Sequence, residues 1–349
     1  MYYLLITVIL LMYINLRFQP IGRFRDKMET QYAYIICVFL VLLAAFRGDA
    51  VGADTESYRE HYEFMYMYNS LPALIDRYSI YYMGYYIPCK LFHLLHLPVQ
   101  VWFGFVMALY LYSMMRLINK FSKDKIFSIL IFITNGLWAF SMAGLKQTFA
   151  MSLMMLAFVF FLEKRYLWTT LFVIAIYYTH QSALIGLAAF PLYYFRKSKW
   201  FMPIILLTCF FIYSSSFLLM ESMVEILGNE KWVDYLVTDS QYTYVTFIFY
   251  SVITGVAFIN IRNYISIDPE YAKYFLGLSI LGCGIQLFAG VSPSLFRLAY
   301  LYTPFMMILL PNSIVYSHSS YKSISKIFLV ASVIFYFLYA NRNWPYEFC

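Results

Sequence analysis

Charged residues are scarce in this sequence. Only 12% of its 349 residues are charged, whereas 62% are hydrophobic, and the mean hydropathy is +0.67. Soluble domains carry about 25% charged residues, so this chain cannot cover an ordinary water-facing surface. The shortage excludes a soluble enzyme, a nucleic-acid-binding domain and a disordered chain. The net charge of +7 does not argue for nucleic acid, because basic residues also collect in the cytoplasmic loops of membrane proteins.

The cysteines do not indicate a disulfide framework or a metal site. The five cysteines are widely scattered, and no CxxC or Cys/His ligand spacing occurs. Neither a disulfide scaffold nor a zinc site is therefore expected, and we expect no metal and no cofactor. We expect no cleavable signal, because the basic cluster follows the apolar run 1–16 instead of preceding it. We expect this run to be a first anchor helix with its N-terminus outside.

Long apolar runs are abundant. A membrane-spanning helix needs about 20 predominantly apolar residues, and the runs predict an all-α polytopic membrane protein of about 12 transmembrane helices, with both termini outside. Several runs are short for a perpendicular helix, so we expect them to extend into polar flanks or to lie in a locally thinned bilayer. The runs are 1–16, 31–46, 98–117, 126–142, 147–162, 166–180, 182–196, 200–219, 242–261, 272–290, 298–316 and 326–341.

The distribution of Lys and Arg predicts the orientation. One set of loops holds seventeen of the 25 basic residues and six of the 18 acidic ones. This excess marks its side as cytoplasmic, and the remaining loops then face outward. The cytoplasmic set is 17–30, 116–125, 163–165, 196–199, 262–273 and 317–326.

The chain is expected to form a single integral membrane domain over 1–349, with outer loops at 47–97 and 220–241. Within the first of these, residues 79–96 look apolar but contain Pro88, Lys90 and two histidines. A lipid-exposed Lys is costly in a spanning helix. We therefore predict that 79–96 is an interfacial or re-entrant segment on the outer side.

Unusual polar residues converge on the predicted outer side. The loop at 46–62 contains Arg47, Asp49 and Asp54, and Tyr58 shares a face with Asp54 if that part is helical. The alternative is an ordinary solvated loop. Asp49 and Asp54 are also the residues that a divalent cation would select, since carboxylates suit Mg²⁺ or Mn²⁺.

Two further short breaks between apolar runs carry polar residues. Lys146 and Gln147 lie at the outward start of a helix, where an ammonium and exposed backbone N–H groups can hold an anion such as phosphate. The alternative for Lys146 is a snorkelling interface residue. His180 and Gln181 lie in a tight outer hairpin, where His180 is either a proton acceptor, a donor to substrate or a packed polar cap.

Arg297 begins another inward run. An Arg at that edge is either a snorkelling anchor or an anion clamp, because its guanidinium can bind a phosphate through two parallel hydrogen bonds.

Four short motifs occur in order along the chain: FRG-x(3)-G-x-D-T-x(2)-Y at 46–58, G-L-K-Q at 144–147, T-H-Q-S-A-L at 179–184 and R-x(2)-Y at 297–300. Together they resemble the EpsG-type family of bacterial polysaccharide polymerases, which are similar in role to the Wzy O-antigen and capsule polymerases. The family usually has Arg before the Gln, where this chain has Lys146. Lys keeps the charge but loses the bidentate fork.

The resemblance implies a glycosyltransferase of the bacterial cytoplasmic membrane with its active site outside. It implies that oligosaccharide repeat units linked to undecaprenyl pyrophosphate serve as donor and acceptor, in a membrane shared with other polysaccharide-assembly proteins. We assign Arg47, Lys146 and Arg297 to the pyrophosphate and His180 or Asp54 to the general base. Asp49, Tyr58, Gln147 and Gln181 are expected to bind substrate or order the loop.

Two other functions remain open from the sequence. One is another outer-face transferase, either an O-antigen ligase or an acyltransferase. The other is a flippase or transporter of lipid-linked glycans, although a transporter should place charges near the bilayer midplane and often contains paired repeats.

Overall fold

A computed structural model of the chain describes residues 2–19, 22–227, 243–287, 296–317 and 322–340. Over these residues every regular element is a helix and there is no strand, which confirms the all-α class. Each of the twelve apolar runs overlaps one helix or two or three consecutive helical segments. The chain is therefore a helical membrane protein.

Contacts between Cα atoms divide the chain into two compact units. Unit 1 comprises residues 1–184 and 329–349, and unit 2 comprises 185–328. The helices of unit 1 are α1 (Tyr2–Phe18), α2 (Arg23–Ala45), α3 (Thr55–Glu63), η1 (Phe64–Met67), α4 (Leu71–Tyr78), η2 (Ile80–Tyr82), α5 (Met83–Leu94), α6 (Val99–Phe121), α7 (Lys125–Thr134), α8 (Leu137–Ala143), α9 (Leu145–Leu162), α10 (Tyr166–Tyr177) and the end of α18 (Lys322–Ala340).

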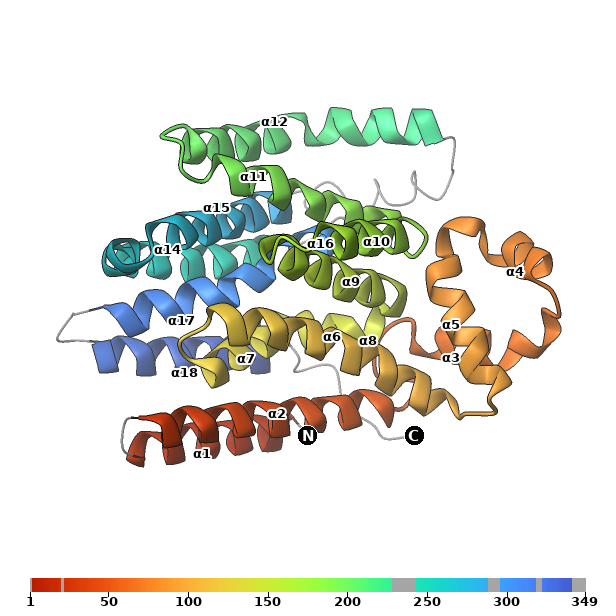
Figure 1. The fold of residues 1–349 in the computed structure, drawn as a ribbon, viewed down its shortest axis with the longest axis horizontal. Helices are drawn as coiled ribbons and strands as arrows, with labels where there is room; N and C mark the ends of the chain where they lie inside the picture. The colour runs from red at the N-terminus through yellow and green to blue at the C-terminus, as the bar shows by residue number, and fades with distance from the viewer. Residues whose placement is uncertain (1, 20–21, 228–242, 288–295, 318–321, 341–349) are drawn as a thin grey trace. The chain divides into compact units, whose positions relative to one another are not determined.

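The core of unit 1 is built around α6 and α9. Helix α6 packs against both α2 and α9, and α9 packs in turn against α10 (Figure 1). Nearly all residues of α9 are buried, because its sequence is apolar on every side and neighbours cover it all round. The short helices α3, α4 and α5, drawn in orange, gather at one end of this bundle (Figure 1).

The predicted cytoplasmic loops of unit 1 contact one another. An Nη2 of Arg116 donates to Oε1 of Glu163 at 3.0 Å, and Nζ of Lys125 donates to Oγ1 of Thr30 at 2.6 Å. These pairs join the segments 17–30, 116–125 and 163–165. The Lys and Arg excess of these segments is thus collected in one place, as the orientation argument requires.

Unit 2 is organised around α15, which packs against α12, α14 and α17. Asp268 caps the first turn of α15 by accepting a hydrogen bond from the backbone N–H of Tyr271, and Pro269 follows at the first helical position. The elements of unit 2 are α11 (Ala189–Phe195), α12 (Phe201–Leu227), α14 (Thr243–Ile267), α15 (Pro269–Gln286), α16 (Phe296–Ala299), η6 (Thr303–Phe305), α17 (Met306–Tyr316) and the start of α18; η3 (Gln181–Ala188) crosses from unit 1 into unit 2.

Four of the described helices are long and apolar enough to cross a membrane: Arg23–Ala45, Val99–Phe121, Leu145–Leu162 and Tyr244–Ile267. The pair α7 and α8 counts as a fifth if it is one span bent by 51°. Six shorter apolar helices lie on other predicted runs. About 12 crossings therefore remains a prediction, as do the single-domain organisation and the outward termini.

Three predicted runs are interrupted. The run 126–142 breaks between α7 and α8 at Gly136, whose φ of 80° suits a residue without Cβ. The run 182–196 becomes η3 followed by α11, and the run 298–316 is divided among α16, η6 and α17. Residues 79–96 form η2 and the short helix α5, which contains Pro88. Of the second predicted outer loop, 220–227 lies in α12 and 228–241 lies outside the described residues.

Candidate functional site

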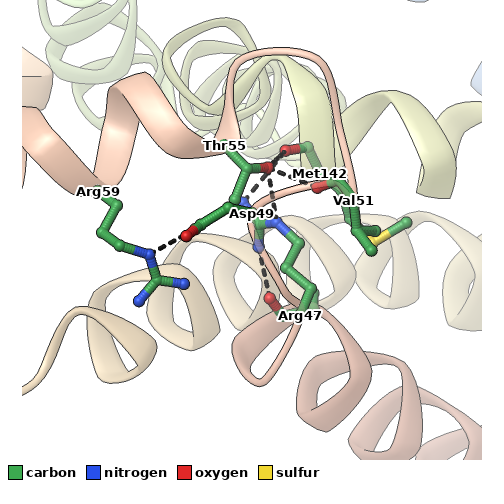
Figure 2. Close-up of polar contacts among 7 residues, drawn as sticks. Arg47, Asp49, Val51, Thr55, Arg59 and Met142 are labelled. Atoms are coloured by element: carbon green, nitrogen blue, oxygen red, sulfur yellow. Dashed lines mark hydrogen bonds and ion pairs between the residues drawn. The ribbon is translucent and has the colours of Figure 1, made fainter. Parts of the chain in front are cut away.

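Arg47 anchors the loop that follows α2. Its side chain is fully buried. Its Nε donates to Oγ1 of Thr55 and its Nη2 to the backbone oxygen of Met142, both at 3.1 Å, while Nη1 donates to the backbone oxygen of Ala44 (Figure 2). The guanidinium also lies 4.2 Å from the ring centroid of Phe103. A buried charge needs such partners, and together they favour a structural role for this arginine.

Thr55, which accepts the hydrogen bond from Arg47, also fixes the backbone of the loop together with Gly52. Thr55 donates to the backbone oxygen of Val51 at 2.6 Å (Figure 2). Gly52 has a φ of 91°, and a Cβ at this position would lie 2.7 Å from the backbone oxygen of Met142. Only glycine fits this conformation and this close approach. The loop is therefore held against the C-terminal end of α8, just before α9 begins at Leu145.

The two aspartates of the loop have different surroundings. Asp49 is half exposed and forms an ion pair with Arg59, whose Nε lies 2.6 Å from Oδ1 of Asp49 (Figure 2). Asp54 is the N-cap residue of α3 and is half-buried. Its carboxylate is the negative charge that acts on Lys146. Asp54 thus adds a negative charge near Lys146, whereas Asp49 stabilises the loop at its surface.

Lys146 lies among three tyrosines. Its ammonium is 5.0 Å from the ring centroid of Tyr82, 5.5 Å from that of Tyr86 and 5.8 Å from that of Tyr58. Its Nζ also donates to the hydroxyl of Tyr86 at 3.4 Å. The side chain is half-buried at the first turn of α9. Cation–π attraction, worth about 0.5–2 kcal/mol per contact, partly replaces the water that burial removes.

His61 completes this group, which we call the Lys146 cluster: Tyr58, His61, Tyr78, Tyr82, Tyr86 and Lys146. The His61 ring meets Tyr78 edge-on at 5.3 Å and Tyr86 at 6.2 Å, and these two tyrosines stack at 3.8 Å. Burial lowers the pKa of His61, and the positive charges of Lys146 and Arg77 lower it further. Burial also raises the pKa of Tyr86 well above its ordinary value.

His180 borders the cluster. Its ring centroid lies 6.0 Å from that of Tyr82, and its Nδ1 shares a hydrogen bond of 2.7 Å with Oγ of Ser182. The end of α10 is held against the start of α5, because the backbone N–H of Gly84 donates to the oxygen of Tyr178 at 2.7 Å. This backbone contact places His180 beside the tyrosines.

The remaining predicted residues divide between the two units. Gln147 is buried in α9 and Gln181 is exposed at the start of η3. Both belong to unit 1, as do Arg47, Asp49, Asp54, Tyr58, Lys146 and His180. Arg297 lies in α16 of unit 2, where it is half-buried. That Arg297 and Lys146 belong to one site stays a prediction.

The structure adds residues that sequence reasoning did not single out. His61 lies in the predicted outer loop, Tyr82 and Tyr86 lie in the predicted interfacial segment 79–96, and none of the three belongs to a motif. One signal was present: Tyr58 and His61 are three residues apart, and Tyr82 and Tyr86 are four apart, so that each pair shares a helix face. Among the described residues no three His, Cys, Asp or Glu side chains gather as a metal site.

Comparison with known proteins gives one clear relationship. No curated protein and no solved structure matches the chain significantly. The family model of EpsG, in contrast, matches residues 31–348, which is nearly the whole chain. The match confirms the resemblance carried by the four ordered motifs. On this ground the chain belongs to the EpsG family.

Proposed function

We propose that this protein is a polysaccharide polymerase that joins oligosaccharide repeat units linked to undecaprenyl pyrophosphate, at the outer face of the cytoplasmic membrane. Family membership supports a role in polysaccharide biosynthesis. The observation that carries the proposal further is the Lys146 cluster. It combines a half-buried ammonium, four tyrosines and a histidine at one end of unit 1, with His180 beside it.

These groups match the demands of glycosyl transfer from a lipid pyrophosphate. A hydroxyl of the acceptor sugar attacks the anomeric carbon of the donor, and a new C–O bond forms. The bond from the anomeric carbon to the phosphate oxygen breaks, and undecaprenyl pyrophosphate leaves with the bonding electrons. The hydroxyl proton passes to a base. The protein must therefore neutralise the leaving group, hold two sugars and accept one proton.

Each demand has a corresponding group. Lys146 supplies a positive charge to the leaving pyrophosphate, and the N-terminus of α9 adds backbone N–H donors to the same place. Arg297 is proposed as a second phosphate contact. The guanidinium of Arg47 donates to three protein oxygens. We therefore propose that Arg47 positions the loop and does not itself contact the pyrophosphate.

The sugars and the proton are assigned to the surrounding side chains. The flat faces of tyrosine rings suit sugar rings, and we propose Tyr58, Asp49, Gln147 and Gln181 as further sugar contacts. His180 and Asp54 lie in two of the four motifs and are the candidates for the base. Nδ1 of His180 shares a hydrogen bond with Oγ of Ser182, and Asp54 is half-buried at the N-cap of α3.

The proposal is tested by deleting the gene and examining surface glycans and lipid-linked precursors. A polymerase deletion should leave single repeat units in place of long chains, and should accumulate the lipid-linked repeat unit. That repeat unit, extracted and added to purified protein in proteoliposomes, should be converted to a ladder of longer chains. Total loss of surface glycan without elongation in proteoliposomes would overturn the proposal in favour of a flippase or ligase.

A further inference from the structure

A buried nitrogen of the Lys146 cluster has no assignment in the reaction so far. Nδ1 of His61 is shielded from solvent and has no hydrogen-bond partner among the described residues. A buried polar atom left without a partner costs about 1–3 kcal/mol. Such an atom is commonly explained by a group that binds there. The ring is held in place by edge contacts with Tyr78 and Tyr86, so the nitrogen is presented in a fixed direction.

The surroundings of His61 keep its ring neutral. The groups that face it are Lys146 from α9, Arg77 and Tyr78 from α4, Tyr86 from α5 and Glu60 on its own helix. Burial and the two positive charges lower the pKa of His61 and outweigh the opposing effect of Glu60. A neutral imidazole has one nitrogen that donates and one that accepts. With the proton on Nε2, Nδ1 is free to accept.

The two alternatives for the base differ from His61 in their described surroundings. Nδ1 of His180 already shares a hydrogen bond with Oγ of Ser182, and Asp54 is half-buried at the N-cap of α3. His61 is close enough to Lys146 for its pKa to respond to that ammonium. The reaction needs both a base and a cation for the leaving group, and the Lys146 cluster contains one of each.

We propose that His61 is the general base of the polymerase and that its Nδ1 accepts the proton of the acceptor hydroxyl. This inference rests on the proposed function. The O–H bond of the acceptor breaks as its oxygen bonds to the anomeric carbon, and the proton goes to Nδ1. The bond between the anomeric carbon and the pyrophosphate oxygen breaks in the same step. The resulting imidazolium returns its proton to water after the pyrophosphate leaves.

The test measures elongation rate against pH for the full-length protein in proteoliposomes, with the lipid-linked repeat unit as substrate. The wild-type rate should fall on the acidic side, at a pH below the ordinary histidine pKa of 6.5, because the pKa of His61 is lowered and its protonation removes the base. His61→Gln should lower the rate at neutral pH by about 10²–10⁴-fold, change the KM for the lipid-linked unit little, and abolish the acidic fall.

A matched control is His96, which is exposed on the same outer segment and has a φ of 55°. Asparagine tolerates this left-handed conformation, so His96→Asn should keep the wild-type rate and pH profile. His61→Ala should regain part of its rate when imidazole is added, because a free base can enter the space of the missing ring. A side chain needed only for packing would give no such rescue.

The possible failures are distinguishable. Elongation by His61→Gln within about threefold of wild type, with the acidic fall retained, would overturn the assignment of His61 while the polymerase proposal stands, since a general base contributes about 10²-fold or more. Loss of rate without imidazole rescue, together with a lower Tm, would assign His61 to structure instead. Absence of any ladder with the wild-type protein would overturn the proposed function itself.

Discussion

At the scale of single residues, Arg47 and Lys146 carry the same charge in very different surroundings. Arg47 is fully buried and its guanidinium donates to three protein oxygens. Lys146 is half-buried, and its described contacts are aromatic rings and one tyrosine hydroxyl at 3.4 Å. Only the second arrangement leaves a charge that can respond to a substrate anion.

Removing the charge at Lys146 is the first prediction. Lys146→Gln should lower elongation by about 10²-fold or more, as deletion of one preorganised charge-stabilising group does. Lys146→Arg should retain or improve activity, because a guanidinium keeps the charge, lies well on tyrosine rings and adds a bidentate fork. Arg297→Gln should also lose about 10²-fold if it binds phosphate. Polymer length is measured in membranes with matched protein levels.

The control for this series is Lys27→Gln, which removes an exposed charge from a predicted cytoplasmic loop and should leave polymer length unchanged. Wild-type polymer from both Lys146→Gln and Arg297→Gln would show that these residues are interface anchors. Loss of activity in Lys146→Arg as well would mean that the site selects the compact shape of lysine instead of its charge.

At the scale of elements, apolar runs predicted where helices form, but not where they break. The run 126–142 contains no proline, and its break depends on Gly136 adopting positive φ, which hydropathy does not report. The same limit applies to the site. The outward loops, Lys146 and His180 could be assigned to one end from charge counting alone. His61 could not, because α3 has nine residues and its inward face is defined by contact with α5.

The contact between α5 and α10 gives the second prediction. At Gly84 a Cβ would lie 2.2 Å from Oγ1 of Thr179 and 3.0 Å from the backbone oxygen of Tyr178. Gly84→Ala should therefore separate Tyr82 from His180, lower the stability by about 1–3 kcal/mol and reduce elongation. Tm in detergent and elongation rate are the measurements.

Gly255 provides the matched control for Gly84. It lies inside α14, and nothing lies within 4 Å of a Cβ at its position. Gly255→Ala should leave Tm unchanged or raise it, since alanine in a helix is favoured over glycine by about 0.5–1 kcal/mol. Equal Tm values for both alanine variants would show that the backbone contact at Gly84 is unimportant for the fold.

A third prediction concerns the junction of α11 and α15. Glu270 pairs with Lys197 at 2.5 Å and with Arg196 at 2.6 Å. The hydrogen bond from Lys197, followed by that from Arg196, lowers the pKa of Glu270 below its ordinary value of 4.5. A carboxyl whose pKa is lowered by folding stabilises the fold above its unfolded pKa, and this contribution is lost as pH falls through the folded pKa.

Glu270→Gln should accordingly lower Tm at neutral pH, where the contribution is fully present, and should leave Arg196 nearly buried without its carboxylate. The difference in Tm between wild type and variant should shrink as pH falls below about 4.5. Thermal melts across this range measure it. A difference that is constant with pH would show that the ion pair contributes through packing and not through charge.

At the scale of the whole chain, the orientation argument and the structure of unit 1 agree on which segments belong together. The segments 17–30, 116–125 and 163–165, which the Lys and Arg count assigns to the cytoplasm, are joined by the pairs Arg116–Glu163 and Lys125–Thr30. Helices α3 and α5 and the start of α9 meet in the Lys146 cluster, and His180 after α10 borders it. A glycan polymerase of the proposed type needs the second group of segments to face outward.

The last prediction tests this sidedness with single cysteines. In a background whose native cysteines are replaced by serine or alanine, Ser57→Cys and Lys123→Cys each introduce a thiol at an exposed position, one on either group of segments. A membrane-impermeant maleimide should label Ser57→Cys in intact cells, and Lys123→Cys only after permeabilisation, because charged reagents do not cross the hydrocarbon core. The reverse pattern would place the Lys146 cluster in the cytoplasm, where a polymerase of exported repeat units could not reach its substrate. Labelling of both sites in intact cells would instead break the assignment of loops to sides, and with it the requirement that Lys146 and Arg297 share one face.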